Sequence, residues 1–202
     1  MASTTIVFGE DALCCELGSA VLDQMGCVAR ALPPAGGAAK FQGGISRMNE
    51  VARNGFTVLM IADADQAVCA PVQFASWFPR GAHPNLLLRL AVRESESWVL
   101  ADRIAFAEFA QVSAAVVPRL PDELPDPKQS LLNLIRRGKR RDLRDEMLPA
   151  RESRSKIGLG YNAHLQRFVC ERWSADRALE NSPSLARAVG RIRDAIDGRH
   201  TP

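Results

Sequence analysis

The chain has 202 residues, 47% hydrophobic and 24% charged, with a net charge of +3, which is an ordinary composition for a globular protein. Its apolar runs fall far short of the roughly 18 residues of a membrane-spanning helix, and "MASTTIVFGED" lacks the basic start and long apolar core of a signal peptide. Five cysteines without a CxxC pair predict reduced, mostly buried thiols rather than disulfides or a zinc site, so we expect a cytoplasmic protein with no membrane partner.

Strands and helices alternate along the first half of the chain. The expected elements are strand 4–8, helix 12–26, strand 27–33, a Pro- and Gly-rich loop 33–44, helix 45–55, strand 57–61, a short helix 71–78 and strand 85–92. The segment 57–61, "TVLMI", is too apolar for a strand with one wet face, which predicts a central position in a parallel or mixed sheet. The alternation predicts an α/β fold: a three-layer sheet with helices on both faces.

The second half of the chain is expected to be helical. Segment 98–112 predicts a helix in two pieces, with Asp102 as the N-cap of the second. Four prolines exclude a continuous helix or a central strand in 116–128. Further helices are expected at 129–148, at 161–173 and from about Ser184, which can cap its own helix. We therefore expect an α/β core, residues 1–115, and a helical C-terminal portion, residues 116–202, packed on that core.

Acidic residues follow three of the predicted strands. They are Glu10 and Asp11, then Asp63 and Asp65, then Glu94 and Glu96. Because the carboxyl ends of parallel strands meet at one edge of a sheet, we expect these side chains to lie close together. Carboxylate oxygens suit Mg²⁺ or Mn²⁺, and a cation would relieve the repulsion within a pair of neighbouring aspartates. The alternative interpretation is that Asp65 caps a helix and Asp63 is a solvated neighbour.

These acids also carry a resemblance. A glutamate after the first strand followed by Asp63-Ala64-Asp65 resembles the TOPRIM arrangement of topoisomerases, primases and overcoming-lysogenization-defect nucleases. The chain is also similar to a family of small TOPRIM-like bacterial proteins of unassigned function that are associated with phage defence. That similarity lies in "RESESWVLAD", in the "DPK" at 126–128 and in "YNAHLQRFV". One departure is that Gly9 precedes Glu10, whereas in the family the glycine follows the glutamate.

The resemblance implies a TOPRIM-like fold and a Mg²⁺- or Mn²⁺-dependent nuclease centre. The implied metal ligands are Glu10, Asp63, Asp65 and Glu94, and these four with Lys128 are the expected catalytic residues. Glu10 is either a ligand or the general base for the attacking water. Glu94 is preferred to Glu96 because it lies closer to the end of the strand. Lys128 and Lys156 are the candidate cations for the phosphate.

The expected partner is nucleic acid. Segment 136–156 holds 9 basic and 4 acidic residues, which favours phosphate binding, although a solvated face is the alternative. The family also implies a neighbouring ATPase or sensor protein as a partner. A second interpretation is a non-catalytic TOPRIM-like module that binds a phosphate-bearing ligand or a partner protein, and a lysine or arginine ion-paired at the acidic point would favour it. Phosphotransfer on a small nucleotide stays open as a third.

Overall fold

A four-stranded parallel sheet forms the centre of the protein. The computed structural model describes residues 4–64, 70–78 and 81–198. The sheet order is β2-β1-β3-β4, with β1 (Thr4–Gly9), β2 (Val28–Ala31), β3 (Thr57–Asp63) and β4 (Leu86–Ala91). The α/β class is confirmed. The central position predicted for "TVLMI" is also confirmed, because β3 lies between β1 and β4.

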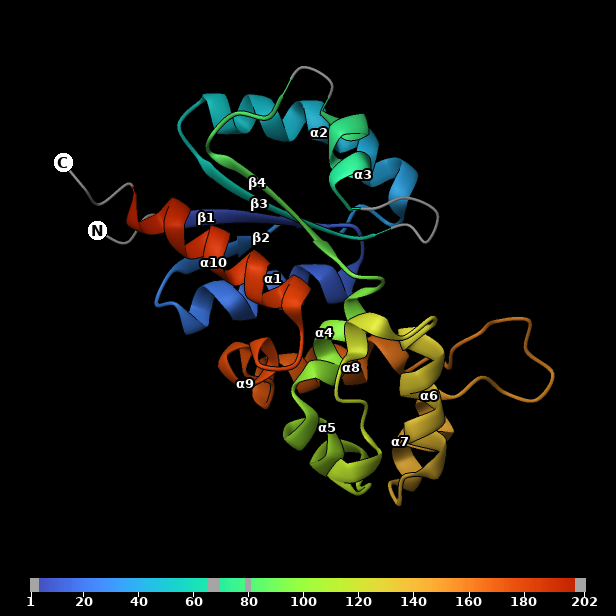
Figure 1. Cartoon of the computed structure of the whole chain (residues 1–202). Coiled ribbons are helices and arrows are strands. Elements are labelled where there is room, and N and C mark those ends of the chain that lie inside the picture. The colour runs from blue at the N-terminus through green and yellow to red at the C-terminus, as the bar shows by residue number, and fades with distance from the viewer. Residues whose placement is uncertain (1–3, 65–69, 79–80, 199–202) are drawn as a thin grey trace.

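Helices cover both faces of the sheet and form a lobe beyond one of them. The α-helices are α1 (Ala12–Gln24), α2 (Ala38–Arg53), α3 (Ala70–Trp77), α4 (Ser95–Ala101), α5 (Arg103–Ala110), α6 (Pro127–Arg137), α7 (Arg141–Met147), α8 (Tyr161–Glu171), α9 (Ala175–Leu179) and α10 (Pro183–Asp197). Two short 3-10 helices follow α5: η1 (Ala114–Val116) precedes the prolines, and η2 (Pro121–Glu123) lies within the proline-rich segment. Helices α2 and α3 lie over one face, α1 and α10 lie over the other, and α4 to α9 form the lobe (Figure 1).

The side chains of β3 explain why this strand is central. Val58, Met60 and Ala62 lie in the apolar cluster under α2 and α3. Leu59 and Ile61 lie in the cluster shared with α1, α10 and the lobe. Successive side chains of a strand point to opposite faces, and here both faces are buried. Removing each of these larger side chains from water contributes about 1.5–3 kcal/mol, which fixes the register of the whole sheet.

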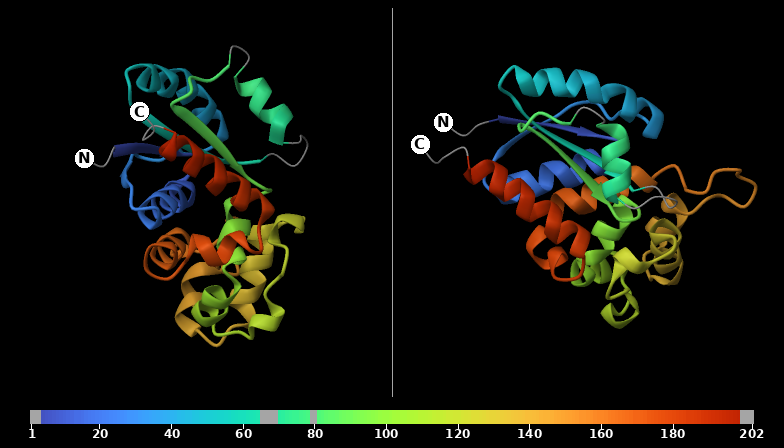
Figure 2. Two further views of the ribbon diagram at one scale, coloured as in Figure 1. Left: turned by 60° about the vertical axis from the view of Figure 1, so that its left-hand side comes forward. Right: turned by 45° about the horizontal axis from the view of Figure 1, so that its top comes forward.

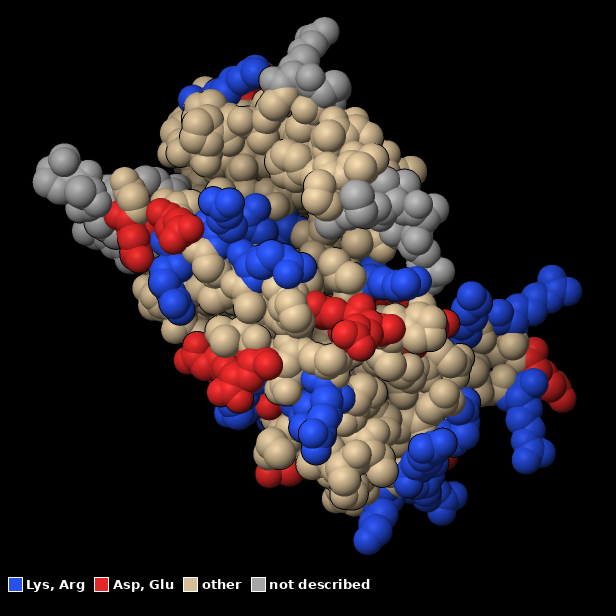
Figure 3. Space-filling model, viewed as in Figure 1, with Lys and Arg blue, Asp and Glu red and all other residues tan. Residues whose placement is uncertain are grey.

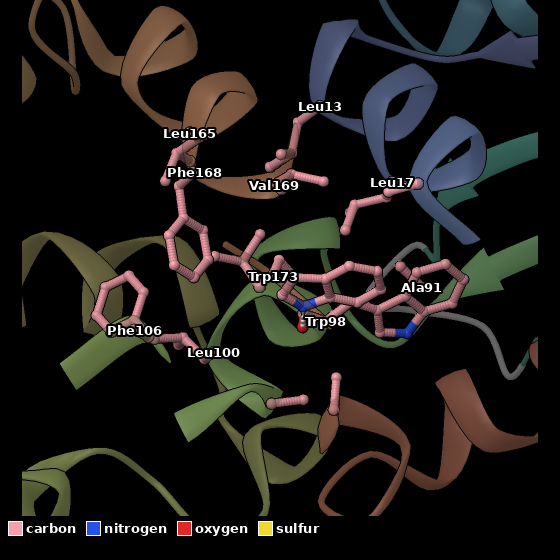
Figure 4. Packing of buried hydrophobic residues seen from close by; sticks show 14 of the residues in the cluster. Leu13, Leu17, Ala91, Trp98, Leu100, Phe106, Leu165, Phe168, Val169 and Trp173 are labelled. Carbon is pink, nitrogen blue, oxygen red and sulfur yellow. Dashed lines mark hydrogen bonds between the residues drawn. The ribbon is translucent and has the colours of Figure 1, made fainter. Parts of the chain in front are cut away.

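The lobe shares its core with α1. Trp98 on α4 is fully buried, and its indole nitrogen donates to the Ser184 hydroxyl at 2.8 Å. Trp173 donates to the carbonyl oxygen of Trp98 at 2.9 Å. Leu13 and Leu17 of α1 reach the same cluster (Figure 4). The helix that follows β4 is therefore held by contacts from α1, from the start of α10 and from the segment after α8.

Asp102 caps α5, as the sequence predicts. One carboxylate oxygen accepts the backbone N–H of Ala105 at 3.4 Å. Asp102 is completely buried and also pairs with Arg177 of α9 at 2.7 Å. A buried carboxylate needs such partners, so this cap ties α5 to α9 as well.

The predicted loop 33–44 is wrong over its second half, because α2 begins at Ala38. Phe41 is fully buried and stacks on Phe8 of β1 with ring centroids 5.4 Å apart. A Cβ at Gly44 would lie 2.8 Å from the Phe8 ring. The glycine therefore lets the helix approach the sheet, and this packing outweighs its low helix propensity.

The predicted cap of the last helix is displaced by two residues. Ser182, not Ser184, caps α10, and its hydroxyl accepts the N–H of Leu185 at 3.2 Å. Pro183 takes the first helical position, where a missing N–H costs nothing. The Asp122 carboxylate also accepts hydrogen bonds from the Ser182 hydroxyl and the Ser184 N–H, at 2.7 and 2.8 Å.

The thiols are less uniformly buried than expected. Cys14 and Cys15 are buried, but Cys27 is half-buried and Cys170 is exposed, while Cys69 lies outside the described residues. No disulfide joins the described cysteines. Among the helices that the structure describes, none combines the length and the apolar character needed to cross a membrane.

Candidate functional site at the carboxyl edge of the sheet

Three strands bring acidic residues to one edge of the sheet. Glu10 follows β1, and its N–H donates to the Ile61 carbonyl of β3 at 2.9 Å. Asp63 is the last residue of β3, and its N–H lies 3.4 Å from the Glu10 carboxylate. Glu94 follows β4 at the N-cap position of α4. The acids expected from the strand ends therefore come from adjacent strands, although Asp65 lies outside the described residues.

Asp63 is the most perturbed of these acids. Its carboxylate accepts the N–H of Ser95, the first residue of α4, at 2.7 Å. Burial raises the pKa of the Asp63 carboxyl well above its usual range, and the charge of Glu96 raises it further. Asp11 and Glu10 act in the same direction on this pKa, whereas the Ser95 N–H opposes them. Several carboxylates thus repel one another around the half-buried oxygens of Asp63.

Asp11 and Cys14, at the start of α1, lie beside Asp63. Asp11 caps α1 by accepting the N–H of Cys14 at 2.8 Å. The Cys14 thiol lies 3.9 Å from the Asp63 carboxylate and can donate to it. Burial, followed by the charge of Asp63, raises the pKa of the Cys14 thiol well above its ordinary value. Cys14 is therefore a protonated hydrogen-bond donor and not a nucleophile.

Glu96 is buried on α4 and is held by two donors from the helical lobe. Tyr161 at the start of α8 donates its hydroxyl at 2.8 Å, and the Lys128 ammonium lies 3.2 Å away, both at the same carboxylate oxygen. Burial raises the pKa of Glu96, and the charge of Lys128 opposes that rise. Burial also lowers the pKa of Lys128, but Glu96 and Glu94 outweigh it, so the ammonium stays charged.

Glu94 contacts the start of α6. Its carboxylate accepts the N–H of Lys128 at 3.0 Å, which satisfies a free donor in the first turn of α6. The sequence favours Glu94 over Glu96 as the acid of the site. In the structure Glu96 is the acid of this pair that raises the pKa of Asp63, and it does so through its charge.

The two candidate lysines separate clearly. Lys128 lies between Glu96 and Glu94, and the charge of Asp63 also raises its pKa. Lys156 is exposed in the segment between α7 and α8, which projects from the lobe (Figure 1). Only Lys128 of the two therefore lies among the acidic residues.

The donor chemistry of the edge suits a hard divalent cation, because Glu10, Asp11, Asp63 and Glu96 offer carboxylate oxygens. Among the described residues, which omit Asp65, no three His, Cys, Asp or Glu side chains are grouped closely enough to hold a metal ion. The described acids by themselves therefore do not form a complete set of metal ligands. A bound cation would nevertheless relieve the repulsion between Asp63 and its acidic neighbours.

The basic segment 136–156 is mainly exposed, but some of its charge is already paired. Arg140 pairs with Asp142, and Arg141 pairs with Asp145 at 3.4 Å. Arg151 and Arg154 are exposed in the projecting segment. Figure 1 and the right-hand view of Figure 2 show the projecting segment on the side of the molecule toward which the strands run.

Sequence reasoning missed two parts of this site. It named Glu96 but did not select it, and it assigned nothing to Tyr161. Tyr161 is the one tyrosine of the chain, and its partner Glu96 lies 65 residues away. The sequence offers one signal, the two glutamates of "ESE" at positions 94 and 96. Glutamates at this spacing can have separate roles, and here Glu94 accepts a backbone N–H of α6 while Glu96 is buried.

Comparisons with protein-family models, with curated proteins and with solved structures find no match for this chain.

Proposed function

We propose that the protein is a TOPRIM-like, Mg²⁺- or Mn²⁺-dependent phosphodiesterase acting on nucleic acid. The observation that carries the proposal is the half-buried Asp63 carboxylate, whose pKa is raised by desolvation and then by three further acids, Glu96, Asp11 and Glu10, that follow neighbouring strands. Such an arrangement lowers the stability of the isolated chain. Carboxylates with strongly perturbed pKa values are commonly found at functional sites. A divalent cation bound there would supply charge to polarise a phosphate and to activate water.

The residues of the edge divide into distinct roles in this proposal. Glu10, Asp63 and Asp65 would hold the cation, with Glu96 beside them. Glu10 would either complete the ligand set or act as the general base that accepts the proton of the attacking water. The Lys128 ammonium would contact a phosphate oxygen as negative charge develops there.

The residues behind the edge fix Lys128 in place. Glu96 and Glu94 hold its side chain and its backbone N–H, respectively. Tyr161 anchors Glu96 in turn. Positioning of this kind matters because a displacement of about 1 Å can cost roughly two orders of magnitude in rate. The exposed arginines of segment 136–156 would hold the phosphate backbone of the substrate through counterion release.

The ion pair between Lys128 and Glu96 also favours a second candidate function. It neutralises part of the acidic edge from within the chain, with the nitrogen 3.2 Å from the oxygen. In that case the protein is a non-catalytic TOPRIM-like module that binds a phosphate-bearing ligand or a partner protein such as an ATPase or a sensor. The Lys128 ammonium would then bind the ligand without metal.

Calorimetric titration with Mn²⁺ and Mg²⁺ separates the two functions. We expect the wild type to bind, and we expect the Asp63→Asn/Asp65→Asn double variant to lose binding while keeping its circular dichroism spectrum. Asp145→Asn is the control, because this aspartate is exposed on α7 and is far from the edge in sequence. Absence of binding in the wild type would reject the metal site and leave the module.

The catalytic part of the proposal is tested with Glu10→Gln. This change keeps the size of the side chain and removes its charge, so we expect metal-dependent cleavage of single- and double-stranded DNA and RNA to fall by roughly two to four orders of magnitude. Retained cleavage in this variant would remove Glu10 from the active site. Binding of Mn²⁺ without cleavage of any of these substrates would contradict the nuclease assignment.

A further inference from the structure

A groove runs along the open edge of the sheet. Strand β4 is the outermost strand on this side, because it pairs only with β3. Helix α3 forms one wall of the groove and α10 forms the other (Figure 2). The groove has a volume of about 590 Å³, which is within the range of sites for small organic ligands.

Three arginines line this groove. Arg187 and Arg191 lie one turn apart on α10 and are exposed. Arg89 lies on β4, two residues from Leu87 and two from Ala91, which belong to the cluster under α10. Residues two apart in a strand share a face, so the Arg89 side chain leaves the strand on the α10 side. Figure 3 shows basic side chains gathered over α10 and the neighbouring edge of the sheet. Positive charge is therefore concentrated on one side of the groove.

Arg89 is incompletely satisfied in this position. One terminal nitrogen donates to the Leu88 carbonyl oxygen at 2.6 Å, but the buried Nε has no hydrogen-bond partner among the described residues. Burial, with the charge of Arg191, lowers the pKa of the Arg89 guanidinium to about 10, so it is still charged at neutral pH. A buried donor without a partner costs about 1–3 kcal/mol.

None of the three arginines forms an ion pair with a residue that the structure describes. Asp122 lies near the lining residue Ser184, but its two carboxylate oxygens already accept hydrogen bonds from Ser182 and Ser184. Arginine guanidinium groups bind phosphate in a two-pronged manner, so an anion would satisfy both the charge and the free Nε.

The rest of the groove is apolar. Phe74 and Pro71 of α3 lie opposite the arginines, with Leu90 and Val92 of the β4 region between them. An inorganic anion would occupy only the arginine side. The combination fits a molecule that carries a phosphate at one end and a flat or apolar group at the other.

We propose that the groove between α3 and α10 binds an organic phosphate, with Arg89, Arg187 and Arg191 on the phosphate and Phe74 against the organic group. None of the residues that line the groove is one of the acidic-edge residues, and the proposed binding requires no metal. A nucleotide and a simple aromatic phosphate share this chemistry. A nucleotide differs from a simple aromatic phosphate in its ribose and base, so comparing the affinities of AMP and phenyl phosphate distinguishes the two.

The test is calorimetry of the whole chain in EDTA, with AMP, phenyl phosphate, inorganic phosphate and adenosine as probes. We expect both organic phosphates to bind and adenosine not to bind. AMP binding much more tightly than phenyl phosphate identifies a nucleotide site, and similar affinities identify a general site for phosphate esters. If no phosphate probe binds the wild type at up to about 10 mM, the inference is wrong.

Variants on α10 provide the matched comparison. Arg187→Gln/Arg191→Gln changes two exposed side chains, so the fold is retained, and we expect the affinity for phosphates to fall by roughly tenfold or more. Arg193→Gln is the control, because Arg193 lies on the same helix but lines a different cavity, beside Asp176 and Asp197. We expect it to change affinity by less than about twofold. Equal losses in both variants, or none in the double variant, would overturn the proposal.

Two further variants separate this site from the acidic edge and from a bare anion site. Phe74→Ala should weaken AMP and phenyl phosphate but not inorganic phosphate, because it removes only the apolar wall; an equal effect on all three would contradict the assigned roles. Asp63→Asn should leave binding in EDTA unchanged. A change in phosphate affinity in Asp63→Asn, such as the increase expected when a repelling carboxylate is removed, would move the phosphate to the acidic edge and reject the groove, whatever the outcome of the metal titrations.

Discussion

Replacing Asp63 by asparagine should stabilise the metal-free protein at alkaline pH. The pKa of this carboxyl is raised in the folded state, first by burial and then by the charges of Glu96 and Asp11. Between its unfolded pKa of about 4 and the raised folded value, the folded protein binds the extra proton. The stability that this provides is complete below pH 4 and is lost as the pH rises through the folded pKa.

The size of the effect follows from two opposing contributions. Each unit by which the pKa is raised costs about 1.4 kcal/mol once Asp63 is ionised, and asparagine removes that cost. Asparagine can still accept the Ser95 N–H that now lies 2.7 Å from the carboxylate, but a neutral acceptor loses about 1 kcal/mol relative to a charged one. Because the rise is large, we expect a net gain of about 1 kcal/mol at pH 8, or about 2–4 °C in melting temperature for a chain of this size.

Thermal unfolding at pH 8 and pH 4, with EDTA and with Mg²⁺, measures this. At pH 4 the gain should disappear, since the wild-type carboxyl is protonated there. Mg²⁺ at ten times its dissociation constant should add about 1.4 kcal/mol to the wild type and nothing to the variant. Asp145→Asn, exposed on α7, should change stability by only a few tenths of a kcal/mol. A variant less stable than the wild type at pH 8 in EDTA would refute the argument, because the charge of Asp63 would then be compensated within the fold.

Three other changes test neighbouring features. Lys128→Met should destabilise the fold by about 2 kcal/mol at pH 8 and by less at pH 5. Burial raises the pKa of Glu96, so lowering the pH favours its neutral form, which does not need the ammonium. Equal losses at both pH values in urea unfolding would mean that packing and not charge is lost. Arg151→Glu/Arg154→Glu should weaken nucleic-acid binding most at low salt and reduce the salt slope by about 2 or more, measured by fluorescence anisotropy; an unchanged slope would make the segment a solvated face. Ser182→Ala should cost about 1 kcal/mol in thermal unfolding, since it removes the α10 cap, whereas an unaffected melting temperature would show that Asp122 suffices.

The sequence predicts the sheet well because its signals are local. The apolar run of β3, the acids that follow β1, β3 and β4, and the Asp102 cap can all be recognised from residues that are adjacent in the sequence. The start of α2 was missed because the decisive interaction is the packing of Phe41 on Phe8, which lies far away in sequence. The displaced α10 cap has a similar cause: two serines compete locally, and Asp122 from η2 contacts both.

The site was predictable only as a set of strand ends. The acids behind β1, β3 and β4 follow from the order of strands, whereas the choice between Glu94 and Glu96 depends on which one meets Tyr161 and Lys128. Those partners come from α8 and α6, and no pattern within "RESES" specifies them. The arginine groove has the same character, because Arg89 and Arg191 belong to elements that meet only in the folded chain.

Helix α10 imposes an order on the folding of this chain during synthesis. Its residues Ala188 and Ile192 bury against the cluster that contains Leu87 of β4, so that side of the sheet lacks its cover until residues 183–197 have left the ribosome. A nascent chain that ends after β4 would expose both an apolar surface and an open strand edge, which is a typical template for aggregation. Arg89, which lies on that strand, would then act as a charged gatekeeper against pairing with another chain.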